Sequence, residues 1–319
     1  MTSTAAGPTF ALMGAAGYIA RRHMEAIRDV GGTLTACHDI ADSVGILDTY
    51  APGARFFTYG REFEDHLSYH RPDYLVVCTP NDLHEAHAAL GVRLGCDVIL
   101  EKPAALSGDG IDALIALQAR TRRVVHPVLQ MRYHQGLASF HDLMRARDPG
   151  GPARVTVRYV TRRGPWFATS WKGDPRRSGT IMLNIGIHLF DALAWALGPA
   201  MDIPAASIAA TGDYAEGSIT FAAAVVDWTL STRAADLPDG TDTGAARQIW
   251  VDGEPVCDFS GGAGLHTAMY REILAGDGHT IEDAADGVRL AERVRRAALS
   301  RPGVPPPRQA PATGPQAIR

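Results

Sequence analysis

The sequence has few cysteines, no excess of positive charge and no long hydrophobic run. Its four cysteines are scattered without a CxxC pair, which argues against a disulfide framework or a zinc knuckle and favours a reducing cytoplasm. A formal net charge of −4 gives no basic field for nucleic acid. No apolar run approaches the roughly 18 residues of a membrane span. The first ten residues lack the layout of a signal peptide. We therefore expect a cytoplasmic globular protein without nucleic-acid or membrane partners.

The 319 residues are enough for two domains, and the first third alternates short apolar runs with helical patterns. Such alternation predicts a doubly wound parallel sheet with helices on both faces. We expect this domain to cover residues 1–125. The predicted strands are 9–14, 33–39, 73–79, 97–101 and 124–130, and the predicted helices are 19–30, 86–95 and 110–123.

The pattern changes after about residue 151, where strands follow one another. Strands are predicted at 154–162, 218–231 and 247–253, an apolar helix at 185–197, and two more helices near the end. This order predicts an α+β domain over 126–300 with a large, mostly antiparallel sheet. The proline-rich residues 301–319 are expected to be disordered.

A glycine-rich turn follows the first predicted strand. Gly14, Gly17 and Ala20 have the spacing GxxGxxA, which lets backbone N–H groups approach a pyrophosphate at a helix N-terminus. The better known spacing is GxGxxG, so the motif alone is weak, but its strand-to-helix context supports a Rossmann-type site. Asp39 ends the second strand and would bind the adenosine ribose, and Ile40 offers nothing to attract a 2′-phosphate. The sequence favours NAD over NADP; a plain glycine turn with a surface aspartate is the alternative.

The third strand ends in CTPNDLH, at the edge where such sheets hold their ligands. Its proline and asparagine can form a wall beside the nicotinamide ribose. His84 and His87 are spaced i, i+3, but no acidic or cysteine partner accompanies them, so we expect no metal.

A lysine and a proline follow the apolar run DVIL in the stretch LEKPAALS. A buried strand would exclude both residues. From these residues alone, Lys102 lies either on the rim of a functional cleft or in an ordinary exposed loop.

Four motifs occur in order: the glycine turn, TPNxxH at 79–84, EKP at 101–103 and NIGIHxxD at 184–191. Together they resemble the Gfo/Idh/MocA oxidoreductases over nearly the whole chain. The stretches GAAGYIA, DSVGILD, RLGCDVILEKP, SWKGDPRRS and LHTAMYREILAG are more closely similar to WlbA-type enzymes, the UDP-N-acetylglucosaminuronate 3-dehydrogenases.

The resemblance implies that Lys102 reaches into the active site, next to a cis Lys102–Pro103 peptide bond, and that burial lowers its pKa. His188 lies one helical turn after Asn184, so both side chains would share a face. We assign His188 as general base, Lys102 as the group that polarises the reacting oxygen or relays its proton, and Asn184 as a substrate contact. Without the motif, a lone histidine on an apolar helix is more often a core residue. Asp191 either holds the imidazole tautomer or caps structure.

The segment 162–178 is basic and aromatic, with Trp166 and Trp171 as stacking surfaces. Arginine forks suit carboxylate and phosphate groups, which a sugar nucleotide would carry, although a solvated charge run is the usual alternative. Members of the related group commonly read SRG where this chain has Arg162 before Arg163, which puts the exact substrate in doubt. The expected substrate contacts are Lys102, Arg132, His134, Arg163, Lys172, Arg176, Arg177, Asn184 and His188.

The expected NAD contacts are Gly14, Ala16, Gly17, Tyr18, Ile19, Asp39, Ile40, Thr79, Pro80, Asn81, His84, Glu101, Lys102, Gln130, Trp171 and Lys172. The resemblance implies oxidation of the C3 hydroxyl of a UDP-linked N-acetylated hexuronic acid, UDP-N-acetylglucosaminuronate, to a 3-keto sugar. This step would precede transamination in polysaccharide or O-antigen synthesis. The resemblance also implies that 2-oxoglutarate can reoxidise the NADH. The alternatives are another sugar or cyclitol, for example in antibiotic biosynthesis, and a non-catalytic NAD-binding sensor. Relatives commonly form dimers or tetramers through the open face of the C-terminal sheet, so a homodimer or homotetramer is expected.

Overall fold

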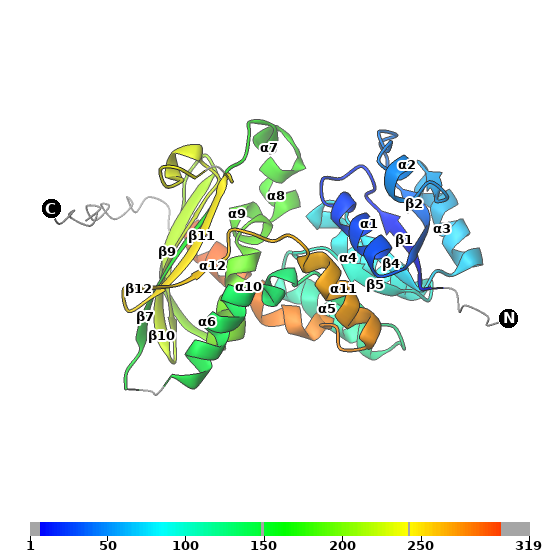
Figure 1. Ribbon diagram of the computed structural model, residues 1–319. Helices are drawn as coiled ribbons and strands as arrows, with labels where there is room; N and C mark the ends of the chain where they lie inside the picture. Colours follow the sequence, from blue (N-terminus) through cyan, green and yellow to red (C-terminus); the bar gives the residue numbers. More distant parts are fainter. Residues whose placement is uncertain (1–6, 148–149, 242, 301–319) are drawn as a thin grey trace.

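The computed structural model describes residues 7–147, 150–241 and 243–300. The expected disordered tail, 301–319, lies outside the described residues. The described chain forms two sheets with most of the helices between and around them (Figure 1).

The first sheet has six parallel strands in the order β3-β2-β1-β4-β5-β6, which confirms the doubly wound prediction. Its strands are β1 (Thr9–Met13), β2 (Thr33–His38), β3 (Arg55–Phe57), β4 (Tyr74–Val77), β5 (Asp97–Leu100) and β6 (Val125–Pro127). Its helices are α1 (Ala20–Asp29), α2 (Leu47–Tyr50), α3 (Gly60–His70), α4 (His84–Arg93) and α5 (Gly108–Ala119). The sequence pattern does not predict β3 and α3, because β3 has three residues and α3 buries only Phe63 and Leu67.

The second sheet has six strands in the order β12-β11-β7-β10-β9-β8, mostly antiparallel as predicted, with β7 and β10 parallel. Its strands are β7 (Ala153–Thr161), β8 (Ala200–Ile208), β9 (Tyr214–Phe221), β10 (Ala224–Ser231), β11 (Ala245–Val251) and β12 (Glu254–Asp258). The single strand predicted over 218–231 is wrong, because β9 and β10 form an antiparallel hairpin. The turn at 222–223 consists of alanines, so it carries none of the usual turn residues.

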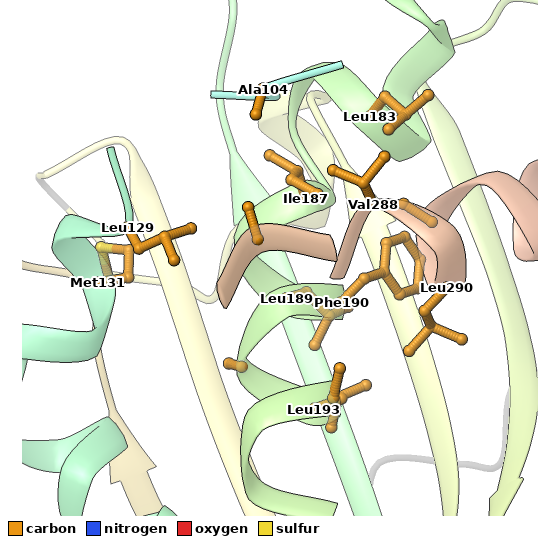
Figure 2. Packing of buried hydrophobic residues seen from close by; sticks show 14 of the residues in the cluster. Ala104, Leu129, Met131, Leu183, Ile187, Leu189, Phe190, Leu193, Val288 and Leu290 are labelled. Atoms are coloured by element: carbon orange, nitrogen blue, oxygen red, sulfur yellow. The ribbon is translucent and has the colours of Figure 1, made fainter. Parts of the chain in front are cut away.

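Three helices cover the side of the second sheet that faces the first domain: α6 (Gln135–Ala146), α10 (Ile187–Leu197) and α12 (Ala285–Ser300) (Figure 1). Figure 2 shows Phe190 and Leu193 of α10 beside Val288 and Leu290 of α12. Phe190 also meets Trp228 of β10 edge-on, with ring centroids 5.4 Å apart. Burial of these large side chains fixes α10, and with it His188, against the sheet.

Several short elements lie between the longer helices and strands. They are η1 (Asn81–Leu83), η2 (Gln130–Tyr133), α7 (Trp166–Thr169), η3 (Trp171–Gly173), α8 (Pro175–Ser178), α9 (Thr180–Asn184), η4 (Ala234–Asp236) and η5 (Ile281–Ala284). Figure 1 shows α7 and α8 between the upper end of the second sheet and the first domain. Helix α11 (Leu265–Ala275) returns to pack on α1. The edge where β1, β4 and β5 end therefore faces the second domain.

Among the described residues, no single helix is long and apolar enough to cross a membrane; one bent pair of helices, 175–184 with 187–197, meets the criterion by length and composition alone. All four cysteines are buried and free.

Candidate active site

The glycine turn after β1 has the shape that a dinucleotide phosphate needs. Gly14 has φ +88°, and a Cβ there would lie 2.6 Å from the carbonyl oxygen of Cys78, so no other residue fits without movement. Ala20, at the third motif position, is fully buried at the start of α1. Ala16 and Gly17 lie exposed on the turn, where the N–H of Gly17 donates to the carbonyl oxygen of Gly14 at 3.0 Å.

Asp39, directly after β2, is tied to this turn. One carboxylate oxygen accepts the N–H of Ala16 at 2.9 Å and the other accepts the N–H of Ala41 at 2.9 Å. A carboxylate has further lone pairs for ribose hydroxyls. Its neighbour Ile40 is 90% exposed and offers no positive charge. Together with the Gly14 turn, these residues fit NAD.

The TPNDLH segment after β4 joins both domains. The buried Asn81 donates from Nδ2 to the carbonyl oxygen of Ser178 at 3.0 Å. The imidazole of His84 lies between two backbone carbonyl oxygens, 2.7 Å from that of Pro103 and 2.8 Å from that of Thr79. His84 thereby links this wall to the EKP loop. Pro80 is half-buried between these residues.

Lys102 leaves the end of β5, next to the Lys102–Pro103 bond, which is cis as predicted. Its half-buried ammonium group donates to the main-chain oxygen of Asn184 at 3.1 Å. Burial lowers the pKa of Lys102 to about 8, and the cations of Arg163, Arg247 and Lys172 contribute, while Glu101 opposes the shift. A lysine with this pKa is partly neutral near pH 7, as a proton-transfer group requires.

Glu101 lies on the opposite side of the loop, in a buried cluster. Its carboxylate accepts from Nε2 of His23 at 3.0 Å and from the N–H of Lys102 at 3.1 Å, and Nε2 of His266 lies 3.6 Å away. Although burial opposes ionisation, the two imidazoles hold the pKa of Glu101 well below its usual range. Tyr270 completes the cluster, with its hydroxyl 2.7 Å from Nδ1 of His23.

This cluster was not found from the sequence, because its members come from α1, β5 and α11. By residue type and spacing, His23, Glu101 and His266 could hold a metal ion. The direct His23–Glu101 hydrogen bond already satisfies both groups without one. The cluster therefore holds the main chain of Lys102 in place through the hydrogen bond from the Lys102 N–H to Glu101.

His188 and Asn184 are closest to Lys102 on the side of the second domain. They do not share one helix as expected: Asn184 ends α9, His188 belongs to α10, and the chain bends by 48° between them. Gly186 lies at this bend, where a Cβ would lie 2.6 Å from Cδ1 of Leu230, so close packing sets the break. Nδ2 of Asn184 is buried without a partner and can donate to a ligand.

The half-buried imidazole of His188 is neutral. Burial and the cations of Lys102 and Arg247 hold the pKa of His188 well below its usual range. A neutral imidazole can accept a proton, which fits the role assigned to it.

Positive side chains dominate the wall beside Lys102. Arg163 follows β7, Lys172 lies in η3, and Arg247 projects from β11. Lys172 lies over the ring of Trp171, 4.2 Å from its centroid, and Arg247 lies 4.9 Å from the ring centroid of Tyr159. The sequence does not identify Arg247 as a site residue, because a single arginine on a half-buried strand belongs to no recognisable motif.

Other expected substrate contacts have partners within the protein. The guanidinium of Arg132 is buried in an ion pair with Asp191, which supports a structural role for Asp191. His134 caps α6, accepting the N–H of Gly136 at 3.1 Å. Arg176 is exposed and pairs with Asp174, and Arg177 pairs with Asp82.

The remaining expected residues are also located. Gln130 is buried in η2, with Oε1 unpaired. Thr79 contacts His87, and Tyr18 is 86% exposed beside the glycine turn with Ile19. Arg162 is exposed.

A Gly14 turn, an acid after β2, and a lysine and histidine at the junction of two domains define an NAD-dependent oxidoreductase. Residues 9–128 match the model of the oxidoreductase family with an NAD-binding Rossmann fold, and residues 138–253 match the GFO/IDH/MocA C-terminal domain. The chain belongs to the Gfo/Idh/MocA family. Three predictions are thereby confirmed: membership of this family, NAD as the cofactor, and NAD-dependent dehydrogenase activity.

Solved structures extend the comparison over the whole fold. The WlbA (WbpB) dehydrogenase from Thermus thermophilus, in complex with NAD and UDP-GlcNAcA, is 39% identical with a TM-score of 0.85, covering 95% of this chain and 97% of that chain. The same enzyme with NAD and alpha-ketoglutarate is 40% identical with a TM-score of 0.85, covering 93% and 97%.

Curated relatives match more narrowly. D-glucoside 3-dehydrogenase from Escherichia coli is 29% identical over 40% of this chain and 36% of its own length. The putative UDP-kanosamine synthase oxidoreductase subunit from Amycolatopsis mediterranei is 29% identical over 58% of this chain and 49% of its own length. The matches thus span half or less of these relatives.

Proposed function

We propose that the protein oxidises the C3 hydroxyl of UDP-N-acetylglucosaminuronic acid, or a closely similar UDP-linked hexuronic acid, to the 3-keto sugar with NAD. The observation that carries this proposal is the junction of Lys102, Asn184 and His188 beside a wall of unpaired cations. The Thermus thermophilus dehydrogenase, similar over nearly its whole length, was crystallised with NAD and UDP-GlcNAcA. The D-glucoside 3-dehydrogenase is named for the same ring position.

The proposed roles follow from the geometry. NAD, when bound, accepts the hydride from the sugar carbon. Asn184 donates from its unpaired Nδ2 to a substrate oxygen and so orients the ring. Lys102, partly neutral, takes or relays the hydroxyl proton, and His188 accepts it. Glu101 holds the main chain of Lys102 in place through its hydrogen bond at 3.1 Å.

Reoxidation of NADH by 2-oxoglutarate is part of the proposal. The similar enzyme from Thermus thermophilus was also crystallised with NAD and alpha-ketoglutarate. The same cationic wall suits a dicarboxylate. In this half-reaction Lys102 would return a proton to the keto oxygen as it becomes a hydroxyl.

A different UDP-linked substrate is the second candidate, favoured by the similarity to the UDP-kanosamine synthase subunit. A sensor without catalysis has no need of a lysine with a pKa of about 8, which argues against that alternative.

A substrate panel tests the proposal. The NAD-loaded protein would be mixed separately with UDP-GlcNAcA, UDP-GlcNAc, UDP-glucose and myo-inositol, and NADH absorbance followed. Fastest turnover with UDP-GlcNAcA supports the proposal. Faster turnover with UDP-glucose would favour the second candidate, and turnover of myo-inositol alone would refute a sugar-nucleotide substrate.

We also retain the proposal of a homodimer or homotetramer formed through the face of the second sheet away from α10. That face presents the exposed side chains of Arg154, Thr156 and Arg158 on β7. Light scattering during size-exclusion chromatography tests it: a monomeric mass at micromolar concentration would contradict it.

A further inference from the structure

Two arginines beside the reacting groups point at the same place. Arg163 donates from one terminal nitrogen to Oγ1 of Thr161 at 3.2 Å, and Arg247 donates to the same oxygen at 3.4 Å. Thr161 is buried, at 2% exposure, so its hydroxyl is a shared anchor for two guanidinium groups. Two permanent positive charges thus meet at one neutral acceptor.

Neither charge is compensated. Among the described residues, no carboxylate forms an ion pair with Arg163, Arg247 or the neighbouring Lys172. The Nε of Arg247 is buried and has no hydrogen-bond partner, which leaves an oriented donor without an acceptor. Placing like charges together in a partly buried wall costs free energy unless an anion binds there.

The arginine pair is held in a fixed orientation. The guanidinium of Arg247 lies over the ring of Tyr159, with Cζ 4.9 Å from the centroid, and Tyr159 is buried in β7. The backbone N–H of Arg247 donates to Oγ of Ser260 at 2.9 Å, and that of Arg163 donates to the carbonyl of Thr232 at 3.0 Å. A planar fork fixed in this way matches the two oxygens of one carboxylate.

The position of the pair relative to Lys102 and His188 indicates which anion it binds. Arg247 is close enough to Lys102 and His188 to lower the pKa of both. Gly186, between Asn184 and His188, packs against Leu230, and Arg163 is hydrogen-bonded to Thr232 two residues beyond Leu230, so an anion bound by the arginine pair lies near the end of α9 and the start of α10. A carboxylate carried on the sugar ring itself meets that requirement.

We propose that Arg163 and Arg247 form a carboxylate subsite, anchored on Thr161, that binds the acid group of the sugar substrate and so selects an acidic sugar over its neutral analogue. This inference rests on the proposed function for the identity of the sugar. Binding of the carboxylate would also offset the positive potential around His188 and make its imidazole a stronger base at the moment when substrate is present.

The first test compares binding of acidic and neutral ligands. Calorimetry would give the Kd of the NAD-loaded protein for UDP-GlcNAcA, for UDP-GlcNAc and for UDP. For wild type we expect UDP-GlcNAcA to bind about 30-fold to 1000-fold more tightly than UDP-GlcNAc. Arg247→Gln should reduce this ratio to below about 3-fold and leave the Kd for UDP unchanged. Arg247→Lys, which keeps the charge and loses the fork, should give an intermediate ratio.

Arg55→Gln is the matched control, because Arg55 also lies over an aromatic ring, that of Phe57 at 4.9 Å, but is exposed on β3 of the first sheet. Its acid-to-neutral ratio should equal that of wild type. Retained NAD and an unchanged circular dichroism spectrum would show that each variant is folded. If Arg247→Gln keeps the wild-type ratio of the two Kd values, the subsite is overturned. If Arg247→Gln loses affinity for UDP as strongly as for UDP-GlcNAcA, the arginine pair binds the diphosphate instead.

A second probe separates failure of the subsite from failure of the proposed substrate. Malonate, a simple dicarboxylate, should bind to the NAD-loaded wild-type protein and should bind at least about tenfold more weakly to Arg247→Gln. If no sugar nucleotide is turned over but malonate binding depends on Arg247, the subsite holds and the substrate is wrong. Malonate binding that is equal in both proteins, or absent from wild type, would refute the subsite.

Discussion

The ammonium group of Lys102 lies 3.1 Å from the main-chain oxygen of Asn184, a contact that joins the loop after β5 to the end of α9. It connects the NAD-binding sheet to the second domain at the site proposed for the reaction. The pKa of about 8 depends on this half-buried position. The first two predictions follow from that relationship.

Lys102 should give the pH dependence of the oxidation. Because the neutral amine takes or relays the proton, kcat/KM should rise with pH and level off above about pH 8, following the lowered pKa of Lys102. His188 should give no step near pH 6.5, because its pKa lies well below that value. Lys102→Ala should lower kcat by about 100-fold to 10,000-fold and abolish the step. Activity that falls above pH 8 would mean that Lys102 acts only as a cation.

Glu101 should control the position of that step. Its carboxylate raises the pKa of Lys102, so Glu101→Gln should lower that pKa further and move the step in kcat/KM to lower pH. The measurement is the pH profile of the variant loaded with NAD, with Glu62→Gln, at an exposed carboxylate on α3, as the control. A step that stays at the wild-type pH would show that Glu101 serves only to hold the fold.

Substitutions of His188 and of Asn184 should change different kinetic parameters. His188→Gln removes the proposed proton acceptor, so kcat should fall by about 100-fold or more with little change in KM. Asn184→Ala removes a ligand donor that is unpaired in the structure, so KM should rise more than kcat falls. Steady-state kinetics with UDP-GlcNAcA test both. Near wild-type kcat for His188→Gln would show that His188 is not the base.

Arg132 should matter for stability and not for substrate affinity. Asp191→Asn leaves its guanidinium buried without its bidentate partner, which should cost about 3 to 5 kcal/mol in the free energy of unfolding. Urea titration followed by fluorescence measures the loss. The exposed pair Arg61–Asp65 provides the control, since Asp65→Asn should have a much smaller effect. Equal losses in the two variants would contradict the structural role of the Arg132–Asp191 pair.

Asp39 should determine the preference for NAD over NADP. In the double variant Asp39→Ser, Ile40→Arg, the negative charge beside the ribose is replaced by a cation, so the Kd for NADP should fall and that for NAD should rise, each by about tenfold or more. Fluorescence titration with NADH and NADPH measures both. Unchanged preference would show that the ribose does not contact this residue.

Much of this account could be predicted from local signals. Strand-and-helix alternation identified the first sheet, and the glycine turn, Asp39 and EKP placed the cofactor edge, because each depends on residues close in sequence. The hairpin β9–β10 was missed because its alanine turn lacks turn residues. The break between Asn184 and His188 follows from packing of Gly186 against Leu230, which no local pattern reveals.

The residues that the sequence could not place depend on distant partners. The ion pair of Arg132 with Asp191, which lies on another helix, is indicated by no local pattern. Arg247 carries no motif, and its position beside Arg163 depends on the pairing of β11 with β7. The cluster around Glu101 combines three segments in the same way.

The most direct test of the account is a product analysis with two substrates. The purified protein would be incubated with UDP-GlcNAcA and 2-oxoglutarate, and the 3-keto sugar and 2-hydroxyglutarate measured by mass spectrometry, with Lys102→Ala in parallel. The account predicts both products in equal amounts from wild type and neither from the variant. Absence of the keto sugar from wild type, with NAD still bound, would contradict the proposed substrate.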